Sequence, residues 1–492
     1  MPEKDVSTKI VDNHSDSILN KLYRHTPGIG PEWGSGGIFG LRYYKGVLYY
    51  TLAFEAQAYF LTKNSTKVYD FSKIGGPPQS GGDTYNAVTT IDDKIYFGGW
   101  VHAPAAYKNK KLLFHNKYSH IHSYNVSSGE IELIWKDGPG GEDTWVGEIS
   151  ELVYDELNNQ LFVARGDGHD NLGLFALDLD TKKMRQISDE PALKGTLFLN
   201  YAIFNTGGFF FDELQYVDID TGKYDTIELE KSEFASKDGE SFEELAPLGS
   251  IGVAGTKLFV FRKGGIVFGD PFQEENDNEP KMSFLRLFDF PNTSISPFRV
   301  NALPIRGGIL TAYNAFPDML GLKSIPFVAP SVLLYITPPM IKIVGVFGAR
   351  VTSLEKVGSK ILVAANTMPN TDKPIPMDSG SREISVLHDD VLDNKPPALE
   401  FTVPTKLVKT HHWGGIPLTG YNHRNLKLYA SKPNTLTVWE YNLGYPLPGE
   451  QYKEEYKTQA GKNIIDLSGF TGVVSFKLSA YDEKGLVNIS LH

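Results

Sequence analysis

Short runs of alternating hydrophobic and polar residues, separated by turn residues, recur along most of the chain. The segments 123–135, 176–188 and 216–228 align without gaps, and each contains two such runs around a polar turn. Alternation with a period of two is typical of strands with one buried face. Two such runs around a turn of Asp, Ser, Thr, Gly or Lys predict a β-hairpin. The segment 60–72 is a looser fourth copy.

Two more strands are expected before each hairpin. In one unit they are 147–155 and 160–166, and in another they are 86–92 and 94–100. The pattern of the second of these strands recurs elsewhere, at 46–54, 207–213, 256–263, 307–314 and 359–366. Four short strands per repeat favour a β-propeller over a sandwich, because a closed ring leaves no long exposed sheet edge.

The spacing predicts an all-β protein with a seven-bladed β-propeller over 35–404, and a count of six or eight blades stays open. The expected blades are 35–72, 80–137, 141–189, 191–230, 240–291, 296–346 and 348–404. After Pro404 the alternation continues without the paired strands that precede each hairpin. A C-terminal antiparallel β-sandwich is therefore expected over 405–492. Residues 1–34 are expected to form a short amphipathic helix and a lead-in.

The repeated hairpins look like generic propeller blades. Together with the closing segment GFTGVVSFKLSAYD at 469–482, they make the chain resemble an uncharacterised archaeal family known only as a domain of unknown function. The resemblance covers nearly the full length. It implies no activity, because no catalytic motif is attached to that family.

Composition narrows the classes of function. The chain has 492 residues, a formal net charge of −11 and no cysteine. An acidic chain repels phosphate backbones, so a nucleic-acid partner is disfavoured. The absence of cysteine excludes a thiolate nucleophile and a Cys-ligated metal, and it hints at a thermostable protein.

Neither the N-terminus nor any internal segment predicts a membrane protein. The first 25 residues contain no apolar core of signal-peptide length, so a cytoplasmic location is expected. The apolar stretch 327–347 contains Pro330, Pro338 and Pro339, and it is interpreted as two strands joined by a turn rather than a membrane span. A homo-oligomer stays open.

A repeated motif marks the candidate site. GGDTY at 81–85 and GEDTW at 141–145 each precede the expected inner strand of a blade. The turn after the second strand of a blade is expected to open on the same mouth of the channel. A polar funnel would then form there, contributed by neighbouring blades and containing Asp83, Asp143, Asp167, His102 and His169, with walls of Trp100 and Trp145.

Other side chains are expected to reach the same opening. Glu55 lies in the corresponding turn of the first blade, and Arg299 and Arg350 begin the expected inner strands of the sixth and seventh. The two arginines could bind a carboxylate or sugar hydroxyls, or neutralise the acidic funnel. A second cluster, THHWGG at 410–415, fits either a mouth or a packed seam between the domains.

Two readings of the funnel stay open. Packed carboxylates perform general acid–base work and a carboxylate pair is needed for glycoside hydrolysis, with histidines able to hold a divalent metal. Asp-Thr after Gly is also a good turn-former, because both side chains bond nearby backbone N–H groups. By the same token, the tryptophans can be core residues and Glu55 a solvated turn residue.

The leading hypothesis is a carbohydrate-active hydrolase acting on a small-molecule or glycan ligand. Asp83, Asp143 and Asp167 would supply acid, base or nucleophile, and His102 and His169 would hold a metal or orient the sugar. Trp100, Trp145, Glu55, Arg299 and Arg350 would bind the substrate. The alternative is a non-catalytic propeller that binds a protein or glycan partner, in which these carboxylates would be tied to the backbone.

Overall fold

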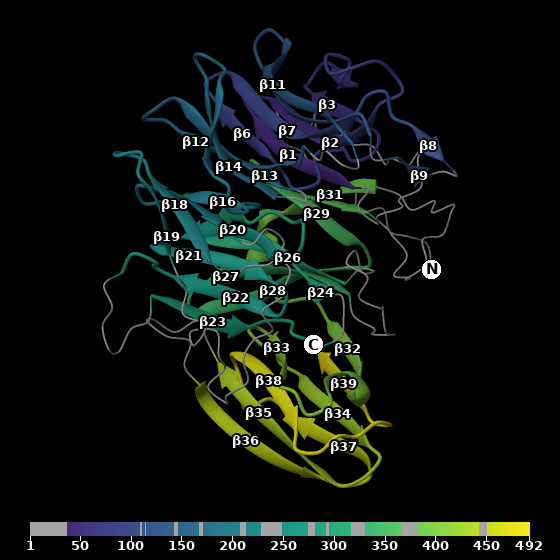
Figure 1. Ribbon diagram of the computed structural model, residues 1–492. Helices are drawn as coiled ribbons and strands as arrows, with labels where there is room; N and C mark the ends of the chain where they lie inside the picture. The colour runs from purple at the N-terminus through teal and green to yellow at the C-terminus, as the bar shows by residue number, and fades with distance from the viewer. Residues whose placement is uncertain are drawn as a thin grey trace.

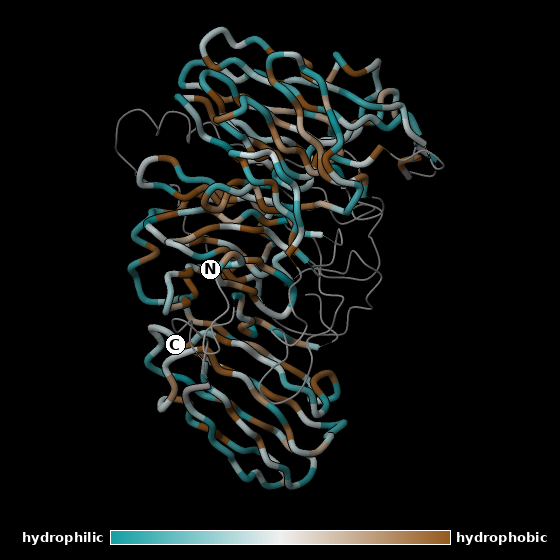
Figure 2. Tube along the Cα trace, turned by 60° about the vertical axis from the view of Figure 1, so that its left-hand side comes forward, coloured by the Kyte–Doolittle hydropathy of each residue, from teal (hydrophilic) through white to brown (hydrophobic). Residues whose placement is uncertain are grey.

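The structure, a computed structural model of the chain, is almost entirely β-strand. It describes residues 37–108, 111–113, 115–141, 146–166, 171–206, 213–227, 248–273, 281–291, 295–315, 330–366, 382–441 and 450–492. The helical elements within these ranges are the 3-10 turn η2 (Asp389–Leu392) and the single-turn helix α2 (Thr405–Val408). Hydrophobic and hydrophilic residues alternate along many strands (Figure 2). The prediction of an all-β protein is confirmed.

Seven small antiparallel sheets follow one another along the chain from Ile38 to His388, and they are called the first to seventh sheets below (Figure 1). The first sheet contains β1 Ile38–Tyr44, β2 Val47–Leu52, β3 Gln57–Leu61 and β4 Thr66–Tyr69. The second contains β5 Ser80–Gly82, β6 Val88–Ile91, β7 Lys94–His102, β10 Lys117–Asn125 and β11 Ile131–Gly140, with β8 Tyr107–Lys108 and β9 Lys111–Leu112 as a separate hairpin. The third contains β12 Ile149–Asp155, β13 Gln160–Gly166, β14 Asn171–Asp178 and β15 Met184–Ser188.

The remaining four sheets of this series have the same meander order. The fourth contains β16 Gly195–Phe198, β17 Tyr201–Asn205, β18 Leu214–Asp218 and β19 Tyr224–Ile227. The fifth contains β20 Leu248–Ala254, β21 Lys257–Arg262, β22 Gly265–Gly269 and β23 Met282–Arg286. The sixth contains β24 Ile295–Ser296, β25 Leu303–Ile305, β26 Gly308–Ala315, β27 Ser331–Thr337 and β28 Met340–Phe347. The seventh contains β29 Arg350–Val357, β30 Lys360–Asn366 and β31 Arg382–His388.

The hairpins predicted from the sequence are present. The pairs β3–β4, β10–β11, β14–β15 and β18–β19 are antiparallel hairpins at the four predicted places. In the fourth sheet the second strand is Tyr201–Asn205 and not the expected GGFFFDE segment, whose residues 207–212 lie outside the described residues. Ala202, Ile203 and Phe204 are fully buried there, so this shorter run supplies the hydrophobic contacts of that strand.

The apolar stretch near residue 340 forms the expected pair of strands. β27 and β28 pair antiparallel and are joined by a turn at the two prolines. Within the part of the chain that the structure describes, no helix combines the length and hydrophobicity that crossing a membrane requires.

The first strand of each sheet lies toward the inside of a propeller-like arrangement, and these strands contact one another in chain order. β1 also contacts β29, so the first and seventh sheets are neighbours although more than 300 residues separate them (Figure 1). Thr352 Oγ1 donates to the carbonyl of Ile38 at 2.6 Å, and Leu41 N donates to Ser353 Oγ at 3.0 Å. These hydrogen bonds join the beginning of the series of sheets to its end.

The inner strands are irregular near their beginnings. The register shifts within β1, β12, β20 and β29, all within a few residues of the N-terminal end of the strand. In the second and sixth sheets the irregularity is larger and divides the inner strand in two, as β5/β6 and β24/β25. Backbone inserted in this way leaves the ladder and bends away from the sheet. The two inserted segments, 83–87 and 297–302, are called the second-sheet bulge and the sixth-sheet bulge.

Two further sheets of four strands complete the chain. One contains β32 Leu399–Pro404, β39 Leu486–Leu491, β34 Arg424–Ala430 and β37 Gly461–Asp466, and the other contains β33 Trp413–Pro417, β38 Val473–Leu478, β35 Asn434–Tyr441 and β36 Glu450–Thr458. The expected domain boundary at 405 differs from this arrangement, because β32 pairs along its whole length with β39. The alternating pattern of β32 resembles that of the preceding repeats. Only its pairing with β39 shows that it belongs to the C-terminal sheets.

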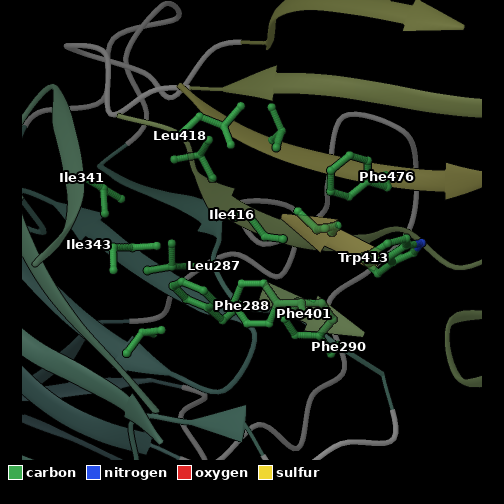
Figure 3. Packing of buried hydrophobic residues seen from close by; sticks show 14 of the residues in the cluster. Leu287, Phe288, Phe290, Ile341, Ile343, Phe401, Trp413, Ile416, Leu418 and Phe476 are labelled. Carbon is green, nitrogen blue, oxygen red and sulfur yellow. The ribbon is translucent and has the colours of Figure 1, made fainter. Parts of the chain in front are cut away.

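A continuous hydrophobic core connects these two sheets to the fifth and sixth sheets. Phe288 and Phe290 lie against Phe401 with ring centroids 5.9 and 5.5 Å apart, and Trp413 lies between Phe290 and Phe476 (Figure 3). Backbone hydrogen bonds reinforce this seam, because Asp289 and Gly414 form an isolated antiparallel bridge. Gly415 has a φ of +68°, and a Cβ there would lie 2.5 Å from the carbonyl oxygen of Arg286.

We predict that Gly415→Ala lowers the free energy of unfolding by more than the cost of placing an alanine in this backbone conformation. A positive φ costs an alanine about 1–2 kcal/mol, and at Gly415 the added methyl group also collides with the backbone of the fifth sheet. Gly222→Ala is the matched control, because its φ is also +68° and nothing lies within 4 Å of the added atom. Chemical denaturation should show Gly415→Ala less stable than the control by at least about 2 kcal/mol. Equal losses of stability in the two variants would show that the backbone at the seam moves to accommodate the added methyl group without cost.

Candidate functional site

Asp83 lies in the second-sheet bulge, between β5 and β6, and its side chain is 1% exposed. Its Oδ1 accepts a hydrogen bond from the backbone N–H of Tyr85 at 2.7 Å, and its Oδ2 accepts one from Ala87 at 2.9 Å. Burial raises the pKa of this carboxyl to about 7, although the backbone donors and Lys194 act in the opposite direction. The carboxylate therefore fixes the fold of the bulge, as in the turn-forming interpretation of the Gly-x-Asp-Thr motif.

The next two residues connect the bulge to the third and fourth sheets. Thr84 donates through both its N–H and its hydroxyl to Glu148, at 2.8 and 2.9 Å from Oε1. The buried ammonium of Lys194 donates to the carbonyl of Tyr85 at 2.8 Å, and it also forms an ion pair with Glu151. A satisfied buried charge of this kind holds the backbone around it in one arrangement.

Asn86 connects the bulge to three other sheets. It has a φ of +65°, a left-handed conformation that Asn adopts more readily than most residues. Its Oδ1 accepts from the N–H of Gly40 in β1 at 2.8 Å. Its Nδ2 donates to the carbonyl of Thr352 in β29 at 3.1 Å and to that of Arg299 in the sixth-sheet bulge at 3.3 Å.

The two bulges meet at Tyr85 and Arg299. The guanidinium of Arg299 lies 4.7 Å from the centroid of the Tyr85 ring and 5.1 Å from that of Phe298, and its NH2 donates to Tyr85 Oη at 3.3 Å. Tyr85 also belongs to a buried cluster with Leu193 and Leu248, from the region of the fourth and fifth sheets. The second-sheet bulge thus contacts elements from all the other sheets of the series.

Arg350 is the first residue of β29, two residues before Thr352, whose carbonyl accepts a hydrogen bond from Asn86. It is 2% exposed, and its guanidinium lies 5.8 Å from the centroid of the Phe39 ring. Burial lowers its pKa to about 9, and the positive charge of Arg299 lowers it further while Tyr85 opposes the shift. The two arginines predicted to face the channel are both buried, and Asn86 joins the two backbone segments that carry them.

His102 lies at the far end of β7 from Asp83, whereas Trp100 pairs with the residue before Asp83. Ser80 pairs with His102 and Gly82 pairs with Trp100, so Asp83 and His102 are at opposite ends of this short ladder. His102 Nδ1 contacts the carbonyl oxygen of His115, and burial lowers the pKa of His102 to about 4. Trp100 is 7% exposed and packs in a small cluster with Phe54, as the core interpretation expects.

Glu55 pairs with a basic residue that the sequence interpretation missed. Its Oε1 lies 3.4 Å from NH2 of Arg382, which begins β31 and is 1% exposed. Arg165, at the end of β13, has a similar partner in Asp137 at 2.7 Å. Both arginines lie at the ends of the sheets where the inner strands begin. Nothing in the alternation pattern distinguishes them from solvated turn residues.

Asp143, Trp145, Asp167 and His169 lie outside the described residues, so their predicted roles remain predictions. Among the residues that the structure describes, no three His, Cys, Asp or Glu side chains are close enough to hold a metal ion. In the 410–415 cluster, His412 is buried in the seam, with its ring 4.6 Å from that of Trp439.

Two buried histidines of β10 were also missed. His120 and His122 are fully buried, their Nδ1 atoms are 3.1 Å apart, and His122 Nε2 bonds Tyr69 Oη at 3.0 Å. Burial lowers the pKa of His120 to about 3 and that of His122 well below its ordinary value. Their spacing of two residues places both on one face of a strand, which was the available signal in the sequence.

The comparisons with known proteins identify the family. The pattern of an uncharacterised protein family conserved in archaea (DUF2139) matches residues 48–374. The chain belongs to this family. The resemblance expected from the sequence is confirmed, and family membership carries no established activity. No curated protein matches the chain.

Several solved structures are distantly similar to the chain. The sialidase of Trypanosoma rangeli has 8% identity and a TM-score of 0.35, with 95% of each chain covered. The exo-β-1,3-galactanase of Phanerochaete chrysosporium has 8% identity and a TM-score of 0.30, with 84% of this chain and 96% of that chain covered. The tricorn protease has 12% identity and a TM-score of 0.36; 74% of this chain aligns, spanning 36% of the protease chain.

We predict that Asp83→Asn lowers the free energy of unfolding by about 1–3 kcal/mol at pH 8. The amide keeps the shape of the side chain but offers an N–H₂ to one of the two backbone donors, which then has no acceptor. Asp178→Asn is the matched control, because Asp178 also accepts backbone N–H groups in a turn but is exposed. Denaturation curves in which Asp83→Asn matches the wild type would show that the carboxylate does not hold the bulge.

We predict that His120→Phe reduces the loss of stability in acid. A histidine held neutral in the folded state but able to bind a proton when unfolded destabilises the fold below its unfolded pKa, near 6.5. The slope of unfolding free energy against pH, between pH 6 and 4, should fall by up to about 1.4 kcal/mol per pH unit in the variant. Asp83 is present in both proteins, so its opposite contribution cancels. Parallel curves would contradict the assigned burial of a neutral His120.

Proposed function

We propose that the seven sheets are the blades of one closed seven-bladed β-propeller and that the two C-terminal sheets form a β-sandwich. The cyclic order of inner-strand contacts, including the hydrogen bonds between β1 and β29, supports the ring. The core shared by Phe401 of one C-terminal sheet and Trp413 and Phe476 of the other supports the sandwich.

The function we propose is the binding of a small-molecule or glycan ligand at the face where the inner strands begin, without hydrolysis of that ligand. The observation that carries this proposal is the state of Asp83. A glycosidase needs two carboxyl groups facing the sugar. Asp83 is 1% exposed and each of its oxygens accepts a backbone N–H group, so its carboxylate is turned toward its own loop and not toward a sugar that enters from solvent.

The position of the connections favours this face for recognition. The connection from the second to the third strand leaves each sheet at the end where the inner strand begins. In the second sheet this connection, between His102 and Lys117, is long enough to carry the separate hairpin of β8 and β9. Long connections on a rigid scaffold are the usual carriers of binding residues. Buried arginines of several sheets, among them Arg165, Arg350 and Arg382, lie at the same ends.

We predict ligand binding without turnover for the purified protein. A panel of nitrophenyl glycosides should give no hydrolysis above that of the Asp83→Asn and Asp143→Asn variants. A panel of polar metabolites and oligosaccharides should contain at least one member that raises the melting temperature, because binding to the folded state alone stabilises it.

Glycoside hydrolysis that disappears in Asp143→Asn without a change in melting temperature would overturn this proposal. Such a result would establish a catalytic carboxylate and restore the hydrolase hypothesis. Failure of every panel member to shift the melting temperature would contradict small-ligand binding and favour a macromolecular partner.

A further inference from the structure

We propose that residues 70–75, called the Phe71 strap below, form an acid-operated lid over two buried histidines of β10, His120 and His122. The strap stays closed while both imidazoles are neutral, and it opens the packing between the first and second sheets when they take up protons. This inference goes beyond the proposed binding function and does not depend on it. Three features support it: a hydrogen-bond chain that ends at His120, the groups that surround the pair, and the conformation of the strap.

A chain of hydrogen bonds runs from the strap into the core. The N–H of Lys73 donates to Tyr69 Oη at 3.3 Å. Tyr69 Oη lies 3.0 Å from His122 Nε2, and His122 Nδ1 lies 3.1 Å from His120 Nδ1. The chain ends there, because His120 Nε2 is buried without a hydrogen-bond partner. When both rings are neutral, one hydrogen between the facing Nδ1 atoms satisfies both of these atoms.

A proton added to this pair finds no opposite charge. Within the described residues, the contacts of the two rings are aromatic side chains, Tyr69 Oη and one another, and none is a carboxylate. One imidazolium would therefore be an unpaired charge in the core, which is costly. Protonation of both rings would in addition set two N–H groups against each other across the 3.1 Å between the Nδ1 atoms.

The charged groups nearest to the pair come from the strap and from β11. Lys73 in the strap donates through its ammonium to the carbonyl of Ile131 in β11. Lys136 in β11 donates to the carbonyl of Ile74 in the strap at 3.2 Å. Asp70 is exposed, and its Oδ1 accepts from a backbone N–H of the strap at 3.1 Å. The two cations that fasten the strap thus oppose a positive charge beneath it, and the carboxylate of the strap lies in solvent.

The strap itself has a demanding conformation and few buried contacts. Phe71 has a φ of +59°, in the left-handed region that bulky residues seldom adopt. It is 1% exposed, and its ring centroid lies 4.8 Å from that of His120 and 5.5 Å from that of His122. Phe71 and Ile74 are the buried side chains of the strap, and the two residues between them are exposed. A strained segment with so few buried contacts opens at low cost.

Proton linkage gives the direction of the switch. Burial lowers the pKa of His120 from its ordinary value of 6.5 to about 3. Burial, the neighbouring His120 and the charge of Lys73 lower the pKa of His122 as well. An open strap exposes both rings to water, so the open form binds more protons once the pH falls below 6.5. Opening then becomes about tenfold more favourable per pH unit for each ring that is protonated.

The test follows amide hydrogen exchange of the full-length wild-type protein from about pH 7.5 to about pH 4.5, across the titration range of histidine. Protection factors, which remove the intrinsic pH dependence of exchange, are measured for the amides of Lys73 and Ile74, which donate to Tyr69 Oη and to the carbonyl of Phe71. We expect constant protection above the ordinary pKa of histidine and a fall of about ten- to a hundredfold per pH unit below it. The amides of β21, which pairs on both sides in the fifth sheet, should stay better protected at every pH.

Two variants separate the histidines from a general effect of acid. His120→Phe removes one of the two titrating rings, so the protection of the strap should fall by at most about tenfold per pH unit. His411→Phe is the matched control, because His411 is exposed, and it should behave as the wild type. NMR titration of the wild-type rings needs no variant, and it should show His120 and His122 gaining protons only as the strap loses protection.

Three results would overturn the inference. Protection of the strap that stays constant in acid would show that the histidines do not control it. Equal protection of the strap and β21 at every pH would show that the strap opens only when the whole protein unfolds. Titration of either ring near its ordinary pKa, while the strap stays protected, would show that the closed cluster accepts the proton.

Discussion

The hydrogen bonds between Asp83 and the backbone of its own bulge are the constraint on which the interior of the ring depends. They fold residues 83–87 into a loop that leaves the second sheet and reaches elements of every other sheet in the ring. In a propeller-like arrangement each sheet packs mainly against the sheets beside it, so contact across the interior is not a necessary consequence of the architecture. Here one short segment supplies it, through the side chains of Thr84, Tyr85 and Asn86.

A second feature of the structure is the way in which buried cations are paired. Lys194 and Arg382 each lie against a carboxylate, and Lys194 also donates to backbone carbonyls, as expected for cations removed from water. Arg299 lies against the face of Tyr85 and donates to its hydroxyl.

The sequence predicted the strands well and the site poorly, for physical reasons. Hairpins such as β14–β15 are local, so alternation and turn chemistry within about a dozen residues specify them. The pairing of β32 with β39 depends on a partner nearly 90 residues away and could not be read from β32 itself.

The Gly-x-Asp-Thr motif was located correctly before an inner strand. Whether its carboxylate faced solvent or backbone depended on the interruption between β5 and β6, which periodicity does not reveal. The sequence placed Arg299 and Arg350 at the beginnings of inner strands, but it did not predict the bulge that brings Tyr85 against Arg299.

The claim that the second-sheet bulge is the rigid centre of the ring, and not part of an open mouth, is tested most directly by amide hydrogen exchange. The N–H groups of Tyr85 and Ala87 donate to Asp83 in the interior, so they should exchange only through large-scale unfolding, as slowly as the central strands β2 and β30. The exposed turn at Asp92 and Asp93 provides a fast-exchanging reference in the same sheet. Exchange of Tyr85 and Ala87 as fast as that turn would contradict the account, because a bulge that opens freely could neither join the sheets nor position Arg299.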